Sequence, residues 1–281
     1  MNIDHKNDVK ICKDMTRAYG TSYFLSTYFF PKKLREATWV LYAFVRHPDE
    51  IVDNIEKDPT VASATLDSWI SDWHRAYNGD LDVHPVLRAN AILWKKYNIP
   101  FEYSTTFFGA MKSDTVKNTF KTYSELESYM NGSATVVGYM MCYLIGFQNG
   151  ALSYARKLAE AFQMTNFIRD IKEDLERGRI YMPLEDIEKY GLNKESFSRL
   201  ESTTEMQNLI SFEIKRTEDL YLEAQKGISM LDEGGRRAVR MSLVLYREIL
   251  LIIKKDPYVV LRGRVRVPKY RKIILIIKNF Y

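Results

Sequence analysis

Long segments with a helical repeat of apolar side chains, separated by few proline and glycine residues, constrain the fold of this chain most strongly. Between Lys32 and Asn54, apolar side chains recur at intervals of three and four residues, which is the spacing of one helix face. The 281 residues include only 13 Gly and 8 Pro, which favours long helices over a turn-rich β architecture. We therefore expect an all-α protein. The apolar residues of this segment are Leu34, Ala37, Val40, Leu41, Phe44 and Val45.

Helix start and stop signals divide the remainder of the chain in the same way. Pro48 lies inside the segment 32–54 and should kink that helix or reset its start. A hydrophobic content of 46% is enough for a substantial core, and no linker or composition break interrupts the chain, so we expect one domain over residues 1–281. The expected helices cover 8–20, 32–54, 60–77, 85–99, 101–113, 123–147, 150–177, 184–190, 193–200, 203–231 and 234–255.

Two acidic motifs of the same form, at residues 49–53 and 170–174, each place two aspartates four positions apart. On a helix these positions share a face, where two like charges repel each other. A divalent cation bound between the two carboxylates turns this repulsion into a net attraction. Mg²⁺ commonly bridges one or two carboxylates to a substrate phosphate. Two such pairs facing one cavity would hold a diphosphate. A solvated acidic helix face is the alternative for either motif alone.

The side chains that flank each motif favour the metal and diphosphate interpretation. Each motif has an arginine beside it and further polar groups on the same helix face. Every one of these groups can bind a metal ion or a diphosphate oxygen. Salt bridges to their own aspartates are the alternative for the arginines, and a hydrogen bond within the core is the alternative for the glutamine. The flanking residues are Tyr42 and Arg46 in the first motif, and Gln163, Asn166 and Arg169 in the second.

Together with the downstream segment Arg-Gly-Arg-Ile-Tyr-Met-Pro at 177–183, the motifs resemble the phytoene/squalene synthase family, the head-to-head isoprenyl diphosphate synthases. The resemblance runs from Tyr19 to the tail. It implies an all-α isoprenoid-synthase fold in which two aspartate-bearing helices face each other across a deep, mostly apolar cavity, with Mg²⁺ at its mouth. The implied metal ligands are Asp49, Asp53, Asn166, Asp170 and Asp174; the implied substrate contacts are Ser22, Tyr42, Arg46, Gln163, Arg169, Tyr246 and Arg264; the implied catalytic residues are the four aspartates and Tyr129, which lines the reaction chamber.

The resemblance also implies a reaction. The segments 129–141 and 261–268 look more like phytoene synthases than squalene synthases, so we expect two geranylgeranyl diphosphates to be joined head to head into phytoene, the first step of carotenoid biosynthesis. A squalene or dehydrosqualene synthase acting on two farnesyl diphosphates is the alternative. Mg²⁺ is the expected cofactor, with Mn²⁺ as its substitute. NADPH is not expected, because the sequence contains no Gly-rich nicotinamide fingerprint.

Two other classes of protein fit the sequence less well. A non-catalytic relative that acts as an assembly protein would typically lose the aspartates, whereas all four remain here. A terpene cyclase or a head-to-tail chain elongator would have a differently spaced first motif. The aspartates and arginines also suit the implied reaction chemically, because Mg²⁺ and arginines stabilise the charge that develops on a leaving diphosphate.

Charge and cysteine content limit the partners and the compartment. The net charge of +5 is a mild excess and gives no nucleic-acid footprint, so no nucleic-acid partner is expected. Cys12 and Cys142 are too few for a disulfide framework, and the polar start of the chain lacks an apolar secretory segment, so we expect a cytoplasmic protein. The apolar stretch 136–147 is too short to span a bilayer. A monomer or a weak dimer is compatible with the sequence.

The C-terminal tail combines basic residues with five consecutive apolar ones, Ile273 to Ile277. One helix face cannot bury all five, so contact with lipid or a partner is expected for some of them. Peripheral association with an anionic membrane is one interpretation of this tail, and a solvated helix with one buried face is the other.

Overall fold

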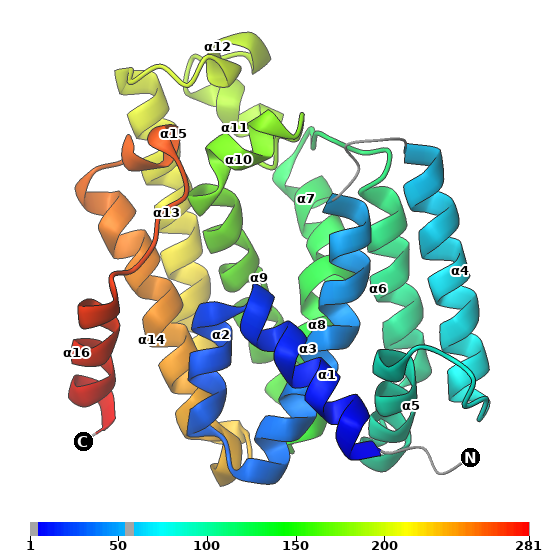
Figure 1. Cartoon of the computed structure of the whole chain (residues 1–281). Coiled ribbons are helices and arrows are strands. Elements are labelled where there is room, and N and C mark those ends of the chain that lie inside the picture. The colour runs from blue at the N-terminus through cyan, green and yellow to red at the C-terminus, as the bar shows by residue number, and fades with distance from the viewer. Residues whose placement is uncertain (1–4, 54–58, 281) are drawn as a thin grey trace. The chain divides into compact units, whose positions relative to one another are not determined.

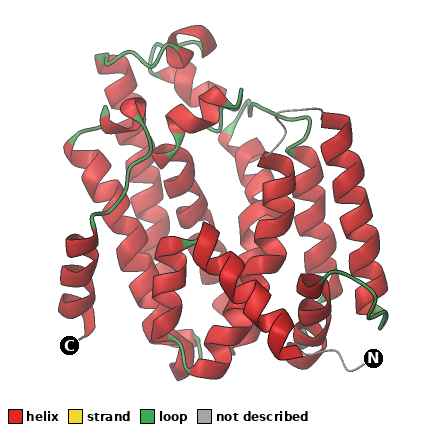
Figure 2. Cartoon of the chain, in the orientation of Figure 1, coloured by secondary structure: helices red, strands yellow, loops and turns green. Residues whose placement is uncertain are grey.

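The structure is a computed structural model that describes residues 5–53 and 59–280 (Figure 1). The side chains of Thr21, Ser22, Asp53, Pro59 and Phe280 lie outside the description. Helices and their connecting loops make up the described chain (Figure 2), which contains isolated β-bridges but no strand. The expected all-α class is therefore confirmed.

The helices follow one another with short connections. Their bounds in chain order are α1 His5–Tyr19, α2 Thr21–Ser26, η1 Thr27–Phe29, α3 Lys32–Asp53, α4 Pro59–Tyr77, α5 Pro85–Tyr97, α6 Phe101–Ser113, α7 Tyr123–Met130, η2 Asn131–Thr135, α8 Val136–Ile145, α9 Ala151–Arg169, α10 Ile171–Glu176, α11 Leu184–Lys189, α12 Lys194–Ser198, α13 Thr204–Gln225, η3 Ile228–Met230, α14 Glu233–Lys255, α15 Val259–Arg262 and α16 Lys269–Phe280.

The chain divides into two compact units, each described here by itself. Unit 1 consists of Met1–Lys117, Val136–Asn149 and Ser229–Ala238, and unit 2 of Asn118–Thr135, Gly150–Ile228 and Val239–Tyr281. The first acidic motif belongs to unit 1 and the second to unit 2. The single domain over residues 1–281 stays a prediction.

Helix α3 is central to unit 1 because its apolar stripe meets α1, α4, α5 and α8. The Phe44 ring is fully buried and lies 4.7 Å, centroid to centroid, from each of the rings of Trp73 and Trp94. The buried Asn90 side chain of α5 donates to the Val40 carbonyl of α3 at 2.9 Å. This packing holds the C-terminal turns of α3, which carry the first motif, on a rigid support.

Helices α9 and α13 pack along each other in unit 2. Between them, the hydroxyls of Thr165 and Tyr221 are 2.8 Å apart in the buried core. The side chain of Thr203 caps the start of α13 by accepting from the Met206 amide, which satisfies one of the amides left open at a helix N-terminus. The second motif follows at the C-terminal end of α9.

Three of the expected helices are divided in the structure. The segment 203–231 forms α13, which ends at Gln225, and the separate short helix η3. The segment 123–147 is not one helix, because the small residues at its centre form the π-helix η2, a wider turn that low helix propensity permits. The segment 150–177 is interrupted at Asp170, whose backbone (φ −105°, ψ 15°) leaves the helical region. Helix α3, by contrast, continues through Pro48 and does not restart there.

No helix in the described part of the chain is long and apolar enough to cross a membrane. The apolar stretch 136–147 instead supplies α8, in which Met140 and Leu144 are buried. This agrees with the expectation of a core helix.

Candidate active site

The first acidic motif is held by an arginine of its own helix. Arg46 forms ion pairs with Asp49, three residues later, and Glu50, four residues later. Its guanidinium also lies over the ring of Tyr19, 5.1 Å from the ring centroid. The Asp49 side chain is nevertheless 39% exposed, so it remains accessible to a ligand. The Asp53 side chain lies outside the described residues.

The N-terminal corner of unit 1 brings Tyr42 against Gly20. A Cβ atom at Gly20 would lie 2.7 Å from the Tyr42 hydroxyl oxygen, so only glycine permits this approach. Tyr23 stacks on Tyr42 with 5.0 Å between the ring centroids. Ser22 follows in α2, but its side chain is among those not described. The corner thus places Tyr42 and Arg46 one turn apart on α3, as the sequence predicts.

The second acidic motif begins with a nearly buried ion pair. Arg169 Nε donates to Asp170 Oδ1 at 2.7 Å, and the two side chains are only 12% and 15% exposed. Burial alone would lower the pKa of Arg169, but the hydrogen bond and the charge of Asp170 raise it above the ordinary arginine value. Arg169 therefore stays cationic beside a carboxylate in a site that is largely closed to water.

The helical hydrogen bonds continue across the interruption at Asp170. The Asp170 amide donates to the Asn166 carbonyl at 2.9 Å, and the Asp174 amide donates to the Asp170 carbonyl at 2.8 Å. Asn166, Asp170 and Asp174 therefore keep a helix-like succession although α9 has ended. The expected spacing of this motif is preserved by backbone bonds rather than by one unbroken helix.

Arg264, from the segment after α15, reaches the same motif. Its Nε is 3.4 Å from Asp170 Oδ1, and its Nη1 is 3.3 Å from Glu173 Oε2. Two arginines thus converge on Asp170 from segments far apart in the sequence. The contact of Arg264 with Glu173 is a feature that the sequence reasoning missed.

Asn166, four residues before Asp170, has an unsatisfied side-chain oxygen. Its Oδ1 atom is buried and has no hydrogen-bond partner among the described residues, while its Nδ2 donates to Gln163 Oε1 at 3.5 Å. A buried polar atom without a partner is costly, and an ion, a water molecule or a ligand can satisfy it. An amide oxygen is a hard oxygen donor of the kind that Mg²⁺ prefers.

The donor chemistry of both motifs fits Mg²⁺, since every candidate ligand is a carboxylate or amide oxygen. Among the residues that the structure describes, no three His, Cys, Asp or Glu side chains gather closely enough to hold a metal by themselves. Mg²⁺ remains an expectation for this chain.

Tyr129 belongs to an aromatic cluster in unit 2. Its ring centroid is 5.0 Å from that of Phe120 and 6.0 Å from that of Tyr181. Tyr181 also stacks on Phe167, with 4.2 Å between centroids and 10° between planes. The sequence reasoning named Tyr129 but not Tyr181, although the segment 177–183 that contains it was part of the motif. Tyr246 packs against Phe162 of α9 at 4.5 Å.

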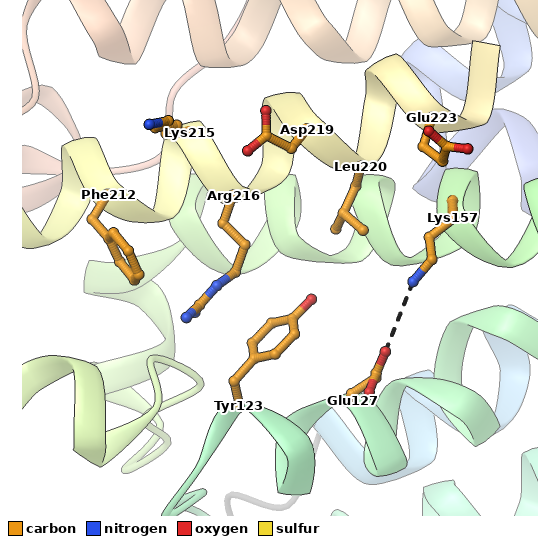
Figure 3. A pocket seen from close by; sticks show the side chains of 9 residues that line it. All are labelled: Tyr123, Glu127, Lys157, Phe212, Lys215, Arg216, Asp219, Leu220 and Glu223. Atoms are coloured by element: carbon orange, nitrogen blue, oxygen red, sulfur yellow. Dashed lines mark ion pairs between the residues drawn. The ribbon is translucent and has the colours of Figure 1, made fainter. Parts of the chain in front are cut away.

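A cavity of about 550 Å³ in unit 2 contains none of the predicted site residues (Figure 3). The side chain of Tyr123 lies across the cavity. Two of the three lining cations have acidic partners: Lys157 is 3.8 Å from Glu127, and Arg216 contacts the buried carboxyl groups of Glu213 and Asp186. The cavity is therefore distinct from the residues of the second motif. Its lining residues are Tyr123, Glu127, Lys157, Phe212, Lys215, Arg216, Asp219, Leu220 and Glu223.

A family model described as squalene/phytoene synthase matches residues 16–271 of this chain. The chain belongs to the squalene/phytoene synthase family. The matched range includes both acidic motifs, the segment 177–183 and Arg264. Members of this family are prenyltransferases, which confirms the class of enzyme expected from the sequence.

Curated relatives of this family member include two cyanobacterial enzymes. The 15-cis-phytoene synthase of Synechocystis sp. is 28% identical, with 94% of this chain and 82% of the relative covered. The 15-cis-phytoene synthase of Synechococcus elongatus is 29% identical, with 93% and 89% covered.

Two solved structures share the fold of this family member. A dehydrosqualene synthase in complex with a ligand has a TM-score of 0.88 and 25% identity, with 98% of this chain and 96% of that chain covered. A squalene synthase from Alicyclobacillus acidocaldarius has a TM-score of 0.83 and 25% identity, with 92% and 97% covered. The expected terpenoid-synthase type of helical fold is thereby confirmed.

Proposed function

We propose that this protein joins two geranylgeranyl diphosphates head to head into phytoene, in a reaction that depends on Mg²⁺. The observation that carries the proposal is the pair of arginines that reach the Asp170 carboxylate, with the buried, unpaired oxygen of Asn166 four residues earlier in the chain. The phytoene synthases to which the chain is similar over more than nine-tenths of its length support the C20 substrate. The synthesis would supply a carotenoid pathway with its first C40 hydrocarbon.

Asp49, Asp53, Asn166, Asp170 and Asp174 are the proposed ligands of the metal. Bound there, Mg²⁺ would neutralise the diphosphate and lower the barrier to its departure. Arg169 and Arg264 offer fixed N–H donors in a partly closed site, where such donors stabilise developing negative charge more strongly than in water. In unit 1, Arg46 and Tyr42 are the corresponding proposed diphosphate contacts, and Ser22 is a further proposed substrate contact. Gln163 is a proposed substrate contact of unit 2.

The proposed chemistry balances without a reductant. Cleavage of the C1–O bond of one substrate releases diphosphate and leaves an allylic cation, which the 2,3 double bond of the second substrate attacks. Loss of a proton closes a cyclopropylcarbinyl diphosphate. A second ionisation releases the other diphosphate, and rearrangement with loss of a proton gives the hydrocarbon. No hydride is consumed, which is consistent with the expectation that NADPH is not needed.

The aromatic cluster around Tyr129 supplies the environment that a carbocation requires. Ring faces of Tyr129, Tyr181 and Phe167 can stabilise a cation through their π electrons. They also exclude water, which would otherwise capture the cation as an alcohol. Tyr246, which lies near Arg169 and packs on Phe162, completes the proposed substrate-binding set.

A squalene-type reaction on two farnesyl diphosphates is the second candidate. It is favoured by the similarity to solved dehydrosqualene and squalene synthases. The two candidates differ in the length of the prenyl chain, and squalene formation also requires a hydride donor.

Product identification distinguishes these functions. The purified protein would be incubated with Mg²⁺ and either geranylgeranyl or farnesyl diphosphate, each with and without NADPH. We expect a C40 hydrocarbon from geranylgeranyl diphosphate without NADPH. C30 products alone would overturn the phytoene assignment, and the absence of product from both substrates would overturn catalysis as proposed.

A further inference from the structure

Helix α16 leaves an apolar face uncovered. Tyr270, Ile273 and Ile277 are 67%, 57% and 57% exposed, and Ile274 is 39% exposed. Their spacing of i, i+3, i+4 and i+7 places all four on one side of the helix. The opposite side, which includes Leu275 and Ile276, is half-buried. The helix therefore has two apolar sides, and only one of them is covered.

An ion pair fixes the rotation of α16. Arg271 Nε donates to Glu248 Oε1 of α14 at 2.7 Å, and the Glu248 side chain is nearly buried. Val265 and Val267, in the segment that leads into α16, are also buried. Because these contacts hold the other side of the helix, the exposed apolar face is a fixed feature of unit 2.

The surroundings of this face are strongly basic. After Asp256 the sequence contains seven Lys or Arg residues and no Asp or Glu. Within the part of the chain that the structure describes, Arg266, Lys269 and Lys278 have no carboxylate partner. Burial lowers the pKa of Lys272, and the nearby charges of Arg266 and Lys269 lower it further. The crowding of like charges would be relieved by an anionic surface.

The basic residues stand at the edges of the apolar face. At 100° per residue, Lys269 and Lys278 project to opposite sides of the arc formed by Tyr270, Ile273 and Ile277. An apolar stripe with lysines along its borders is the arrangement of helices that lie in a membrane interface. Tyrosine is also enriched at the level of lipid headgroups.

We propose that α16 docks unit 2 onto an anionic lipid surface, with the exposed apolar face among the acyl chains and the flanking lysines at the headgroups. The helix has 12 residues and is about 18 Å long, compared with about 30 Å for the hydrocarbon core of a bilayer, so it lies in the interface and does not span it. Membrane attachment of this kind is independent of the prenyl chain length that the enzyme accepts.

Charge complementarity selects lipid over a second copy of the chain. Self-association through α16 would bring two basic flanks together, and neither copy offers an acidic residue after Asp256 to compensate them. An anionic bilayer supplies both the negative headgroups and the apolar phase. An anionic bilayer can therefore contact both the apolar face of α16 and its basic flanks.

Vesicle binding tests the proposal with the full chain. Co-sedimentation would compare vesicles of phosphatidylglycerol and phosphatidylcholine with vesicles of phosphatidylcholine alone. The test variants are Ile273→Asn/Ile277→Asn, which removes apolar contacts, and Lys269→Gln/Lys278→Gln, which removes flanking charge. The matched control is Val61→Asn/Val116→Asn, because both valines are exposed apolar residues of unit 1. Circular dichroism and Mg²⁺-dependent diphosphate release in detergent would show that each variant folds.

We expect the wild type to bind anionic vesicles at least tenfold more tightly than neutral ones. The isoleucine variant should lose at least tenfold in this affinity, the lysine variant should lose affinity and salt dependence, and the valine control should stay within twofold. Absence of wild-type binding, or equal binding by the isoleucine variant, would overturn the proposal. A dimer that the isoleucine substitutions dissociate, without vesicle binding, would assign the face to self-association instead. Vesicle binding can succeed or fail whether or not the proposed reaction is found.

Discussion

Arg264 Nε lies 3.4 Å from Asp170 Oδ1, so the C-terminal segment contributes directly to the second acidic motif. Arg169 approaches the same carboxylate at 2.7 Å from the preceding position. Glu173 also pairs with Arg264, so two carboxylates face the two guanidinium groups. The Arg264 side chain is 41% exposed and its contacts with both carboxylates are longer than 3 Å, so its guanidinium remains accessible to a diphosphate. This accessibility is the basis of the first prediction.

Replacing Arg264 by alanine should lower kcat/KM by about tenfold to hundredfold, because one cation that stabilises the leaving diphosphate is lost. Steady-state diphosphate release with a prenyl diphosphate measures the effect. Arg262→Ala is the matched control, since Arg262 is exposed and pairs with Asp256 instead. Equal losses in both variants would show that Arg264 has no specific role.

Asn166→Ala should raise the Mg²⁺ concentration needed for half-maximal turnover by about tenfold, since it removes the unpaired oxygen assigned to the metal. Titration of turnover with Mg²⁺ gives this value, and Asn208→Ala, an exposed position on α13, serves as the control. An unchanged Mg²⁺ requirement in Asn166→Ala would remove this residue from the proposed ligands.

Stability should fall as pH rises from 6 to 8, because of Glu213. Burial raises the pKa of Glu213 to about 8, and Asp186 adds to the shift while Arg216 opposes it. Between the unfolded value of 4.5 and about 8, the folded protein holds a proton that the unfolded chain has released, so raising the pH favours unfolding. The loss in unfolding free energy should be about 2 kcal/mol between pH 6 and pH 8.

Urea unfolding at a series of pH values tests this assignment. Glu213→Gln should flatten the pH dependence, since glutamine imitates the protonated carboxyl but cannot ionise. Glu218→Gln, at a half-buried position on the same helix that pairs with Lys254, should leave the slope unchanged. A wild-type slope in Glu213→Gln would contradict the assignment.

Gly235→Ala should destabilise the protein by about 1–3 kcal/mol through overpacking. A Cβ atom at Gly235 would lie 2.3 Å from Ile145 Cγ2 in unit 1, whereas one at Gly234 would meet only Pro31 Cγ, at 3.5 Å. Gly234→Ala, one position earlier on α14, should therefore be neutral or stabilising by up to about 1 kcal/mol. Thermal unfolding of the two variants side by side measures the difference, and similar melting temperatures would argue against the close contact.

The regular part of the fold could be predicted because it follows from local pattern. Apolar spacing located α3, and a proline followed by helix formers located α5, whose first residue is Pro85. The exposure of Ile273, Ile274 and Ile277 also follows from pattern, since five consecutive apolar residues exceed one helix face.

What could not be predicted depends on contacts between distant segments. The sequence predicts that Asp170 belongs to an acidic motif next to Arg169, but it does not predict that the backbone of Asp170 interrupts the helix. Arg264 and Tyr181 reach their partners only through the packing of unit 2, which no local periodicity reports. That the Asn166 side-chain oxygen is buried without a hydrogen-bond partner likewise follows only from the three-dimensional positions of its neighbours.

The most direct test of the central claim is Mg²⁺-dependent diphosphate release from geranylgeranyl diphosphate by Asp49→Ala and Asp170→Ala, one substitution in each motif. Both variants should show the helical circular dichroism of the wild type and a loss of at least a hundredfold in turnover, while Asp219→Ala, at an exposed position lining the separate cavity, should retain wild-type turnover. Turnover close to that of the wild type in either motif variant would contradict the assignment of the two motifs to metal and diphosphate.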